Sequence, residues 1–225
     1  MSASMPHKLI DNNWLNSLPE SARKELIGSS RVKQFESGQV VLHKGDPPGS
    51  LFGVISGRVR VCAATFSGEE LVFTSVLPGE WFGEISLLDG EPRTHDSYAV
   101  EDSELAVIPN HAISKLIKTE PAVYTALVRL LCSHCRQAFA AIDDFLLFTP
   151  AQRLAKTLLG LANNAESNSL VKLSQAELGG LIGVSRQTAN KILSDWETRG
   201  LIKRRYGAIE IRSGEALSTL LDIDP

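Results

Sequence analysis

The most regular hydrophobic pattern in the sequence runs from residue 121 to residue 148. Its apolar side chains recur at alternating spacings of four and three residues, which is the heptad pattern of helices that pair along a narrow seam. Pro121 suits a first helical turn, and Thr149-Pro150 ends the run because the residue before a proline is pushed out of the α region. The predicted seam consists of Tyr124, Val128, Leu131, Cys135, Ala138, Ile142 and Phe145. We predict a helix of roughly 40 Å that pairs in parallel with its copy in a homodimer; the alternative is a helix packed on its own domain.

Shorter patterns precede this helix. Strand-like runs punctuated by glycines lie between residues 32 and 108, and short strands with glycine turns at near-regular intervals favour a sandwich or barrel. The runs are Val32–Phe35, Gln39–Leu42, Leu51–Ile55, Arg58–Cys62, Glu70–Val76, His95–Val100 and Glu104–Ile108. Helical spacing flanks them, over Glu20–Ser29 on one side and over Ala112–Lys118, with Asn110 as its cap, on the other.

Helical patterns return after the long helix. Thr149-Pro150-Ala151-Gln152 and Ser174-Gln175-Ala176-Glu177 each have the form of a capping box at a helix start. The second box opens the segment QAELGGLIGVSRQTANKILS, which has the features of a helix-turn-helix. Gly179 fits the point where two helices cross, Gly183 fits a turn that needs positive φ, and Ser185 fits the cap of the second helix.

The second helix of this segment exposes polar side chains of the kind that bond base edges and phosphates in a major groove. A hairpin over residues 200–211 follows as a wing, with basic residues at its tip. We expect Arg186 to bond a guanine, and Arg204 and Arg205 to contact phosphates. The predicted contacts with double-stranded DNA are Ser174, Gln175, Ser185, Arg186, Gln187, Thr188, Asn190, Lys191, Arg204 and Arg205. The alternative is a helical interaction domain with an ordinary polar face.

Charge favours the DNA interpretation. Residues 1–149 hold 13 basic and 18 acidic side chains, whereas residues 150–212 hold 10 basic and 5 acidic ones, so the two parts suit different partners. The three cysteines make no disulfide framework, and neither a signal peptide nor a membrane-spanning apolar run is evident, so we expect a cytoplasmic protein. Cys132 and Cys135 lie one helical turn apart without a second pair, so we predict packing rather than a metal site.

A second constellation, the glycine–glutamate–arginine cassette, spans residues 82–94. Gly83 and Glu84 precede a short apolar helix whose free N–H groups suit an anion. Arg93 can take a phosphate by charge-assisted bonds, and Thr94 adds a hydroxyl donor. The Glu84 carboxylate would repel a phosphate but can accept a hydrogen bond from a ribose hydroxyl, so the cassette suits a sugar phosphate. A structural salt bridge between Glu84 and Arg93 is the alternative.

Taken together, these parts resemble the Crp/Fnr family of bacterial transcription regulators over nearly the whole chain. The resemblance implies an α+β protein: a cyclic-nucleotide-binding-type β-roll (jelly roll) with a helical cap over residues 1–120, a dimerisation helix over 121–148 and a winged helix-turn-helix over 149–225. In that family the cassette binds cyclic AMP, which implies a cyclic-nucleotide effector here and no other cofactor, and RNA polymerase as a further partner. The implied ligand contacts are Gly83, Glu84, Ile85, Arg93, Thr94, Ala138 and Phe139.

Two departures from the cyclic-AMP receptors qualify this resemblance. Those receptors carry glutamate after the arginine that matches Arg186, where this chain has Gln187. They also carry a Thr-Ser pair that contacts adenine across the dimer, where this chain has Ala138 and Phe139. The resemblance therefore implies that the phosphate-ribose half of the site is kept while the base-reading half is changed. A ligand-independent regulator with a vestigial cassette remains the alternative. An enzyme of jelly-roll type would need a His cluster or an acid–base pair, and only His43 and His95 fall in the roll.

Overall fold

The computed structural model describes residues 13–64, 70–163, 170–171, 173 and 175–221. The chain divides into two compact units, residues 1–137 and 138–225, and the boundary between them lies within the long helix α6 (Ala122–Leu147). The predicted three-part division therefore stays a prediction, because the two units share the helix that it treats as a separate spine. Each unit is described below by itself.

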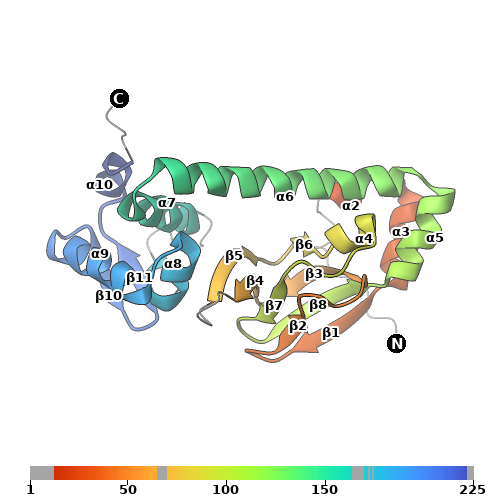
Figure 1. Ribbon diagram of the computed structural model, residues 1–225, viewed down its shortest axis with the longest axis horizontal. Coiled ribbons are helices and arrows are strands. Elements are labelled where there is room, and N and C mark those ends of the chain that lie inside the picture. Colours follow the sequence, from red (N-terminus) through yellow and green to blue (C-terminus); the bar gives the residue numbers. More distant parts are fainter. Residues whose placement is uncertain (1–12, 65–69, 164–169, 172, 174, 222–225) are drawn as a thin grey trace. The chain divides into compact units, whose positions relative to one another are not determined.

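The first unit is built on two antiparallel four-stranded sheets (Figure 1). One has the order β1 (Arg31–Phe35), β8 (Ser103–Ile108), β3 (Leu51–Ser56) and β6 (Trp81–Phe82); the other has the order β2 (Val40–Leu42), β7 (Asp96–Ala99), β4 (Val59–Ala64) and β5 (Glu70–Val76). Buried side chains from both sheets, including Val54, Val59 and Leu105, form one shared core. The predicted β-roll is thus confirmed.

Helices complete the first unit. They are α2 (Asn13–Asn16), α3 (Glu20–Ser29), α4 (Ile85–Asp89), α5 (Asn110–Thr119) and the first part of α6. Trp14 meets Trp81 edge-on, with ring centroids 5.3 Å apart, inside a core that the helices share with the first sheet. Gly53 makes room for this packing, since a Cβ there would lie 2.7 Å from the Trp81 ring. Asn110 is not the cap of α5 as predicted: Pro109 holds that position, and Asn110 accepts a bond from Ser114 inside the helix.

Helix α6 carries two different apolar stripes. One stripe is buried in the core of the first unit and consists of Val123, Ala126, Leu127 and Leu130. Helix α6 therefore packs on its own domain, as in the alternative that the sequence left open. The predicted seam is a separate stripe: Val128 and Leu131 are half-buried, and Tyr124, Cys135, Ala138, Ile142 and Phe145 are exposed. The packing of α6 on its own unit therefore buries a different stripe and leaves most of the predicted seam exposed.

The second unit is a small helical domain with a three-stranded sheet (Figure 1). Its elements are α7 (Pro150–Asn163), β9 (Leu170–Val171), α8 (Gln175–Ile182), α9 (Arg186–Thr198), β10 (Ile202–Arg205), β11 (Ala208–Ile211) and α10 (Gly214–Thr219). Trp196, Leu154 and Leu158 centre its core. The capping box before α7 is confirmed, because the Thr149 N–H and the Gln152 N–H each donate to the other's side chain. Ser174 lies outside the described residues.

Candidate functional site

Gly83 and Arg93 define the cassette in the first unit. Gly83 has a φ of +95°, and a Cβ added there would lie 2.9 Å from the guanidinium of Arg93 and 3.2 Å from the Ser50 carbonyl. Only glycine allows this close approach. The chain then turns through Glu84, whose carbonyl accepts from the N–H groups of Leu87 and Leu88, into helix α4.

Arg93 is a buried cation held by neutral groups. Its side chain donates to the Gly83 and Ser50 carbonyls, each at 2.7 Å, while the residue is 5% exposed. Its Nε has no hydrogen-bond partner, and among the described residues Arg93 forms no ion pair. Burial lowers the pKa of Arg93, while the more distant carboxylates of Asp46 and Glu84 favour its charged form. The salt bridge from Glu84 that the sequence left open is therefore absent from the part of the chain described.

Glu84 instead meets a residue of α6. His134 donates from Nδ1 to the Glu84 carboxylate at 2.7 Å, and Glu84 is 2% exposed. This bond raises the pKa of His134 above its ordinary value, against the opposing effect of burial. Sequence reasoning missed His134, although it follows Leu130 by four residues and so continues the buried stripe of α6.

The other predicted ligand residues are spread more widely. Thr94 is exposed, and its hydroxyl lies 2.9 Å from Nδ1 of His95, whose ring meets that of Phe73 at 4.3 Å. Ile85 is exposed at the start of α4. Ala138 and Phe139 belong to the second unit, where both lie at exposed positions of α6. The structure thus brings Gly83, Glu84 and Arg93 together with His134.

The second unit confirms the helix-turn-helix residue by residue. A Cβ on Gly179 would lie 2.9 Å from the Val184 carbonyl, so the crossing needs glycine. Gly183 has a φ of +68°, and the ring of Phe145 covers it. The Ser185 hydroxyl caps α9 by accepting from the Thr188 N–H at 3.2 Å.

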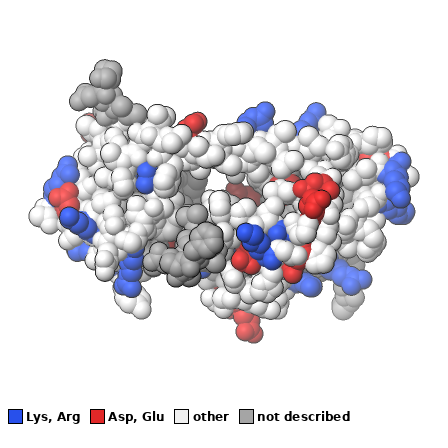
Figure 2. Space-filling view, viewed as in Figure 1, with Lys and Arg blue, Asp and Glu red and all other residues white. Residues whose placement is uncertain are grey.

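Helix α9 buries one face and exposes another. Ala189, Leu193 and Trp196 are buried. The predicted DNA contacts Ser185, Arg186, Gln187, Thr188, Asn190 and Lys191 are all exposed, and Gln175 at the start of α8 is half-buried. Figure 2 shows Lys and Arg side chains along the edge of the second unit that α9 and the wing form, with acidic side chains among them.

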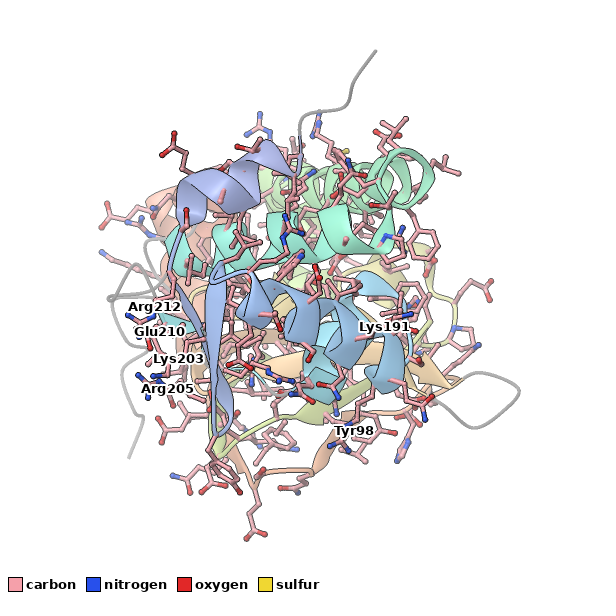
Figure 3. The ribbon with its side chains drawn as sticks, turned by 90° about the vertical axis from the view of Figure 1, so that its left-hand side faces the viewer. Tyr98, Lys191, Lys203, Arg205, Glu210 and Arg212 are labelled. Atoms are coloured by element: carbon pink, nitrogen blue, oxygen red, sulfur yellow. The ribbon has the colours of Figure 1, made fainter. Side chains whose placement is uncertain are left out.

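The wing is the hairpin β10–β11, closed by Tyr206-Gly207, so the basic residues precede the tip rather than occupy it. Arg204 pairs with Glu197 of α9, whereas Arg205 pairs with Glu210 across the hairpin. Lys203, Arg205, Glu210 and Arg212 gather along one side of the wing, apart from Lys191 on α9 (Figure 3). The two wing arginines therefore have different surroundings.

No group of three or more His, Cys, Asp or Glu side chains placed to hold a metal occurs among the described residues. Cys62 is buried, while Cys132 and Cys135 are exposed and unbridged. None of the helices in the described ranges is long and apolar enough to cross a membrane.

A cyclic-nucleotide-type β-roll joined through one long helix to a winged helix-turn-helix defines a class of DNA-binding protein with a separate cyclic-nucleotide-type domain. Comparison with known proteins agrees with this class: residues 32–120 match the cyclic nucleotide-binding domain, and residues 152–220 match the Crp-like helix-turn-helix domain. The chain belongs to the Crp/Fnr family of transcription regulators. It is a DNA-binding transcription regulator and not an enzyme.

Two curated relatives and one solved structure illustrate the likeness. The chain is 30% identical over 204 residues to the CRP-like cAMP-activated global transcriptional regulator of Mycobacterium tuberculosis, covering 88% of this chain and 91% of that one. It is 31% identical over 186 residues to the Cyclic AMP receptor protein of Thermus thermophilus, covering 83% and 86%. The c-di-GMP responsive global regulator CLP of Xanthomonas campestris shares the fold, with a TM-score of 0.77, 24% identity and coverage of 87% and 100%.

Proposed function

We propose that the chain acts in the cytoplasm as a homodimer on pseudo-palindromic DNA, with a cyclic nucleotide at the cassette controlling its DNA affinity. Arg93 carries the proposal. A buried guanidinium without an anion is costly, and its free Nε shows unused donor capacity. A cyclic phosphate would supply the missing negative charge, and Glu84 would accept a bond from the ribose hydroxyl.

The exposed apolar stripe of α6 supports the dimer. Ile142 and Phe145 are each more than half exposed on the same helix that carries His134 next to Glu84. A ligand that changes the Glu84–His134 contact therefore acts on the element that sets dimer geometry, and it would shift the population of dimers whose recognition helices match the DNA. Half-sites about one helical turn, roughly 34 Å, apart are expected. RNA polymerase is the expected protein partner.

The base of the effector is a separate matter. Ala138 and Phe139 stand where the resemblance places the adenine-contacting hydroxyl pair. A base edge left without partners loses ~1–3 kcal/mol per group, so we expect cyclic AMP to bind weakly or to couple weakly to DNA. Phe139 offers a ring face for stacking instead. The named relatives respond to cyclic AMP in two cases and to c-di-GMP in the third, so both classes belong in the test.

Calorimetry with cyclic AMP, cyclic GMP and c-di-GMP, with DNA affinity measured in parallel, tests the proposal. We expect one of them to bind the unaltered chain and Arg93→Leu to weaken it by at least ~10-fold, since a bond to a charged group contributes ~1.5–3 kcal/mol. Lys115→Met is the matched control, because Lys115 pairs with Glu25 on an exposed surface of the same unit. The double change Ala138→Thr, Phe139→Ser should raise cyclic-AMP affinity or its effect on DNA.

Two results would count against the proposal. Tight cyclic-AMP binding with strong DNA activation by the unaltered chain would refute the account of base reading. If no cyclic nucleotide binds while specific DNA binding persists, the ligand-independent regulator with a vestigial cassette is the better interpretation.

A further inference from the structure

Arg204 lies between the wing and the recognition helix. Strand β10 alternates, so Lys203 and Arg205 are exposed on one face and the half-buried Arg204 lies on the other, against α9. Its backbone N–H donates to Glu197 Oε1 at 2.8 Å, and its Nε donates to Glu197 Oε2 at 2.7 Å. One carboxylate therefore fixes both the backbone and the side chain of Arg204.

The guanidinium then reaches Asn190, two turns before Glu197 on the same helix. Its terminal nitrogen donates to Asn190 Oδ1 at 2.9 Å. Arginine has donors only, so the amide atom that faces it must be the oxygen, and the Asn190 NH₂ group points elsewhere. Asn190 is exposed one turn after Arg186, on the surface assigned to DNA.

This orientation decides which base edges Asn190 can meet. Asparagine selects adenine by accepting from N6 and donating to N7 at the same time. Here the side-chain oxygen of Asn190 already accepts from Arg204. An adenine amino group that donated to its second lone pair would lie beside the Arg204 cation. The free NH₂ group, in contrast, suits base acceptors, and the nearby positive charge strengthens such contacts.

We propose that Arg204 is a specificity-determining positioning residue: it holds Asn190 as a hydrogen-bond donor, so that Asn190 meets an acceptor edge such as guanine O6 or N7 and does not select adenine. The inference rests on the proposed role of α9 as the recognition helix. It gives Arg204 a function different from the phosphate contact expected from the sequence, and it leaves that contact to Arg205 on the exposed face of β10.

Selection of binding sites from a randomised duplex library, with the full chain and with and without cyclic AMP, tests this. The base pair whose preference changes in Asn190→Ala is the one that Asn190 contacts. At that pair we expect guanine or another acceptor edge to be enriched over adenine by the unaltered chain. Arg204→Met should shift the preference toward adenine by ~5-fold or more, because the carbonyl is released.

Two further variants make the test specific. Arg205→Met is the matched control, since Arg205 pairs with Glu210 and not with α9; it should weaken binding to all sequences alike and leave the base preference unchanged. Glu197→Gln leaves Arg204 in place but loosens it, and it should shift the preference in the same direction even if Arg204→Met does not fold. The inference would be overturned if the unaltered chain selected adenine at that pair. It would also be overturned if the base preference were unchanged in both Glu197→Gln and a folded Arg204→Met. Neither result would touch the proposed role of α9. An Asn190→Ala profile identical to the unaltered one would also overturn the inference, and only an Arg186→Ala profile that is unchanged as well would refute the role of α9.

Discussion

The seam of α6 gives the sharpest test of the dimer, through the substitution Ile142→Asp. Ile142 is an apolar member of the predicted seam near its C-terminal end, and it is 52% exposed in the single chain. In a parallel pair it would face its own copy. The matched control is Ala140→Asp, because Ala140 is also exposed but lies two residues away, on the side of the helix opposite the seam.

The expected loss of dimer stability can be estimated from the exposed half of the Ile142 side chain. Burying a whole isoleucine side chain contributes ~1.5–3 kcal/mol, so the half that remains available contributes ~1 kcal/mol per protomer and twice that per dimer. Two carboxylates facing each other in the seam add a desolvation penalty of several kcal/mol. The total loss should be at least ~4 kcal/mol, or about a thousandfold in the dimer Kd.

Sedimentation equilibrium over a range of protein concentrations measures this directly, alongside affinity for a two-half-site operator. We expect Ile142→Asp to be monomeric where the unaltered chain and Ala140→Asp are dimeric, and to lose tight operator binding. Circular dichroism should show the same helix content in all three proteins. A dimer that survives Ile142→Asp but dissociates with Ala140→Asp would refute the predicted seam.

Three further predictions address single side chains. Oxidation should give a covalent dimer on non-reducing gels that Cys135→Ser removes and Cys132→Ser does not; a band that depends on Cys132 alone would overturn the register. Because the pKa of His134 is raised in the folded chain, its protonated bond to Glu84 stabilises fully below the unfolded value of about 6.5 and is lost as pH rises through the folded value. The Tm difference between the unaltered chain and His134→Gln should therefore shrink between about pH 6 and pH 9, and a constant difference would contradict the ion pair. Arg186→Ala should cost ~1–3 kcal/mol of base discrimination at fixed salt with an unchanged Tm, and unchanged specific affinity would refute its assignment.

Local chemistry explains what could be predicted from the sequence. Gly179, Gly183 and Ser185 each meet a requirement set by residues a few positions away, so the helix-turn-helix followed from one short segment. Strand β5 was predicted with its observed bounds, Glu70–Val76. Strands β6 and β9 were missed because two residues are too few to show a period, and their pairing comes from distant partners.

The cassette shows where sequence reasoning ends. Its glycine, glutamate and arginine were recognisable from their residue types, but nothing local identifies the residue that meets Glu84. His134 is 50 positions away in the chain, and the heptad of α6 drew attention to a neighbouring stripe. The period of the buried stripe could have predicted that His134 faces its own unit, but only the fold supplies the carboxylate that it contacts.

The wing arginines differ in their surroundings, and the sequence already carried a signal for that difference. Neighbouring residues on a strand face opposite sides, so the sequence alone predicts different surroundings for Arg204 and Arg205. The structure separates them, one bonded to Glu197 and Asn190 and the other to Glu210. The separation has a measurable consequence: removing Arg205 should change the salt dependence of DNA binding by about one phosphate contact, whereas removing Arg204 should change which bases are preferred.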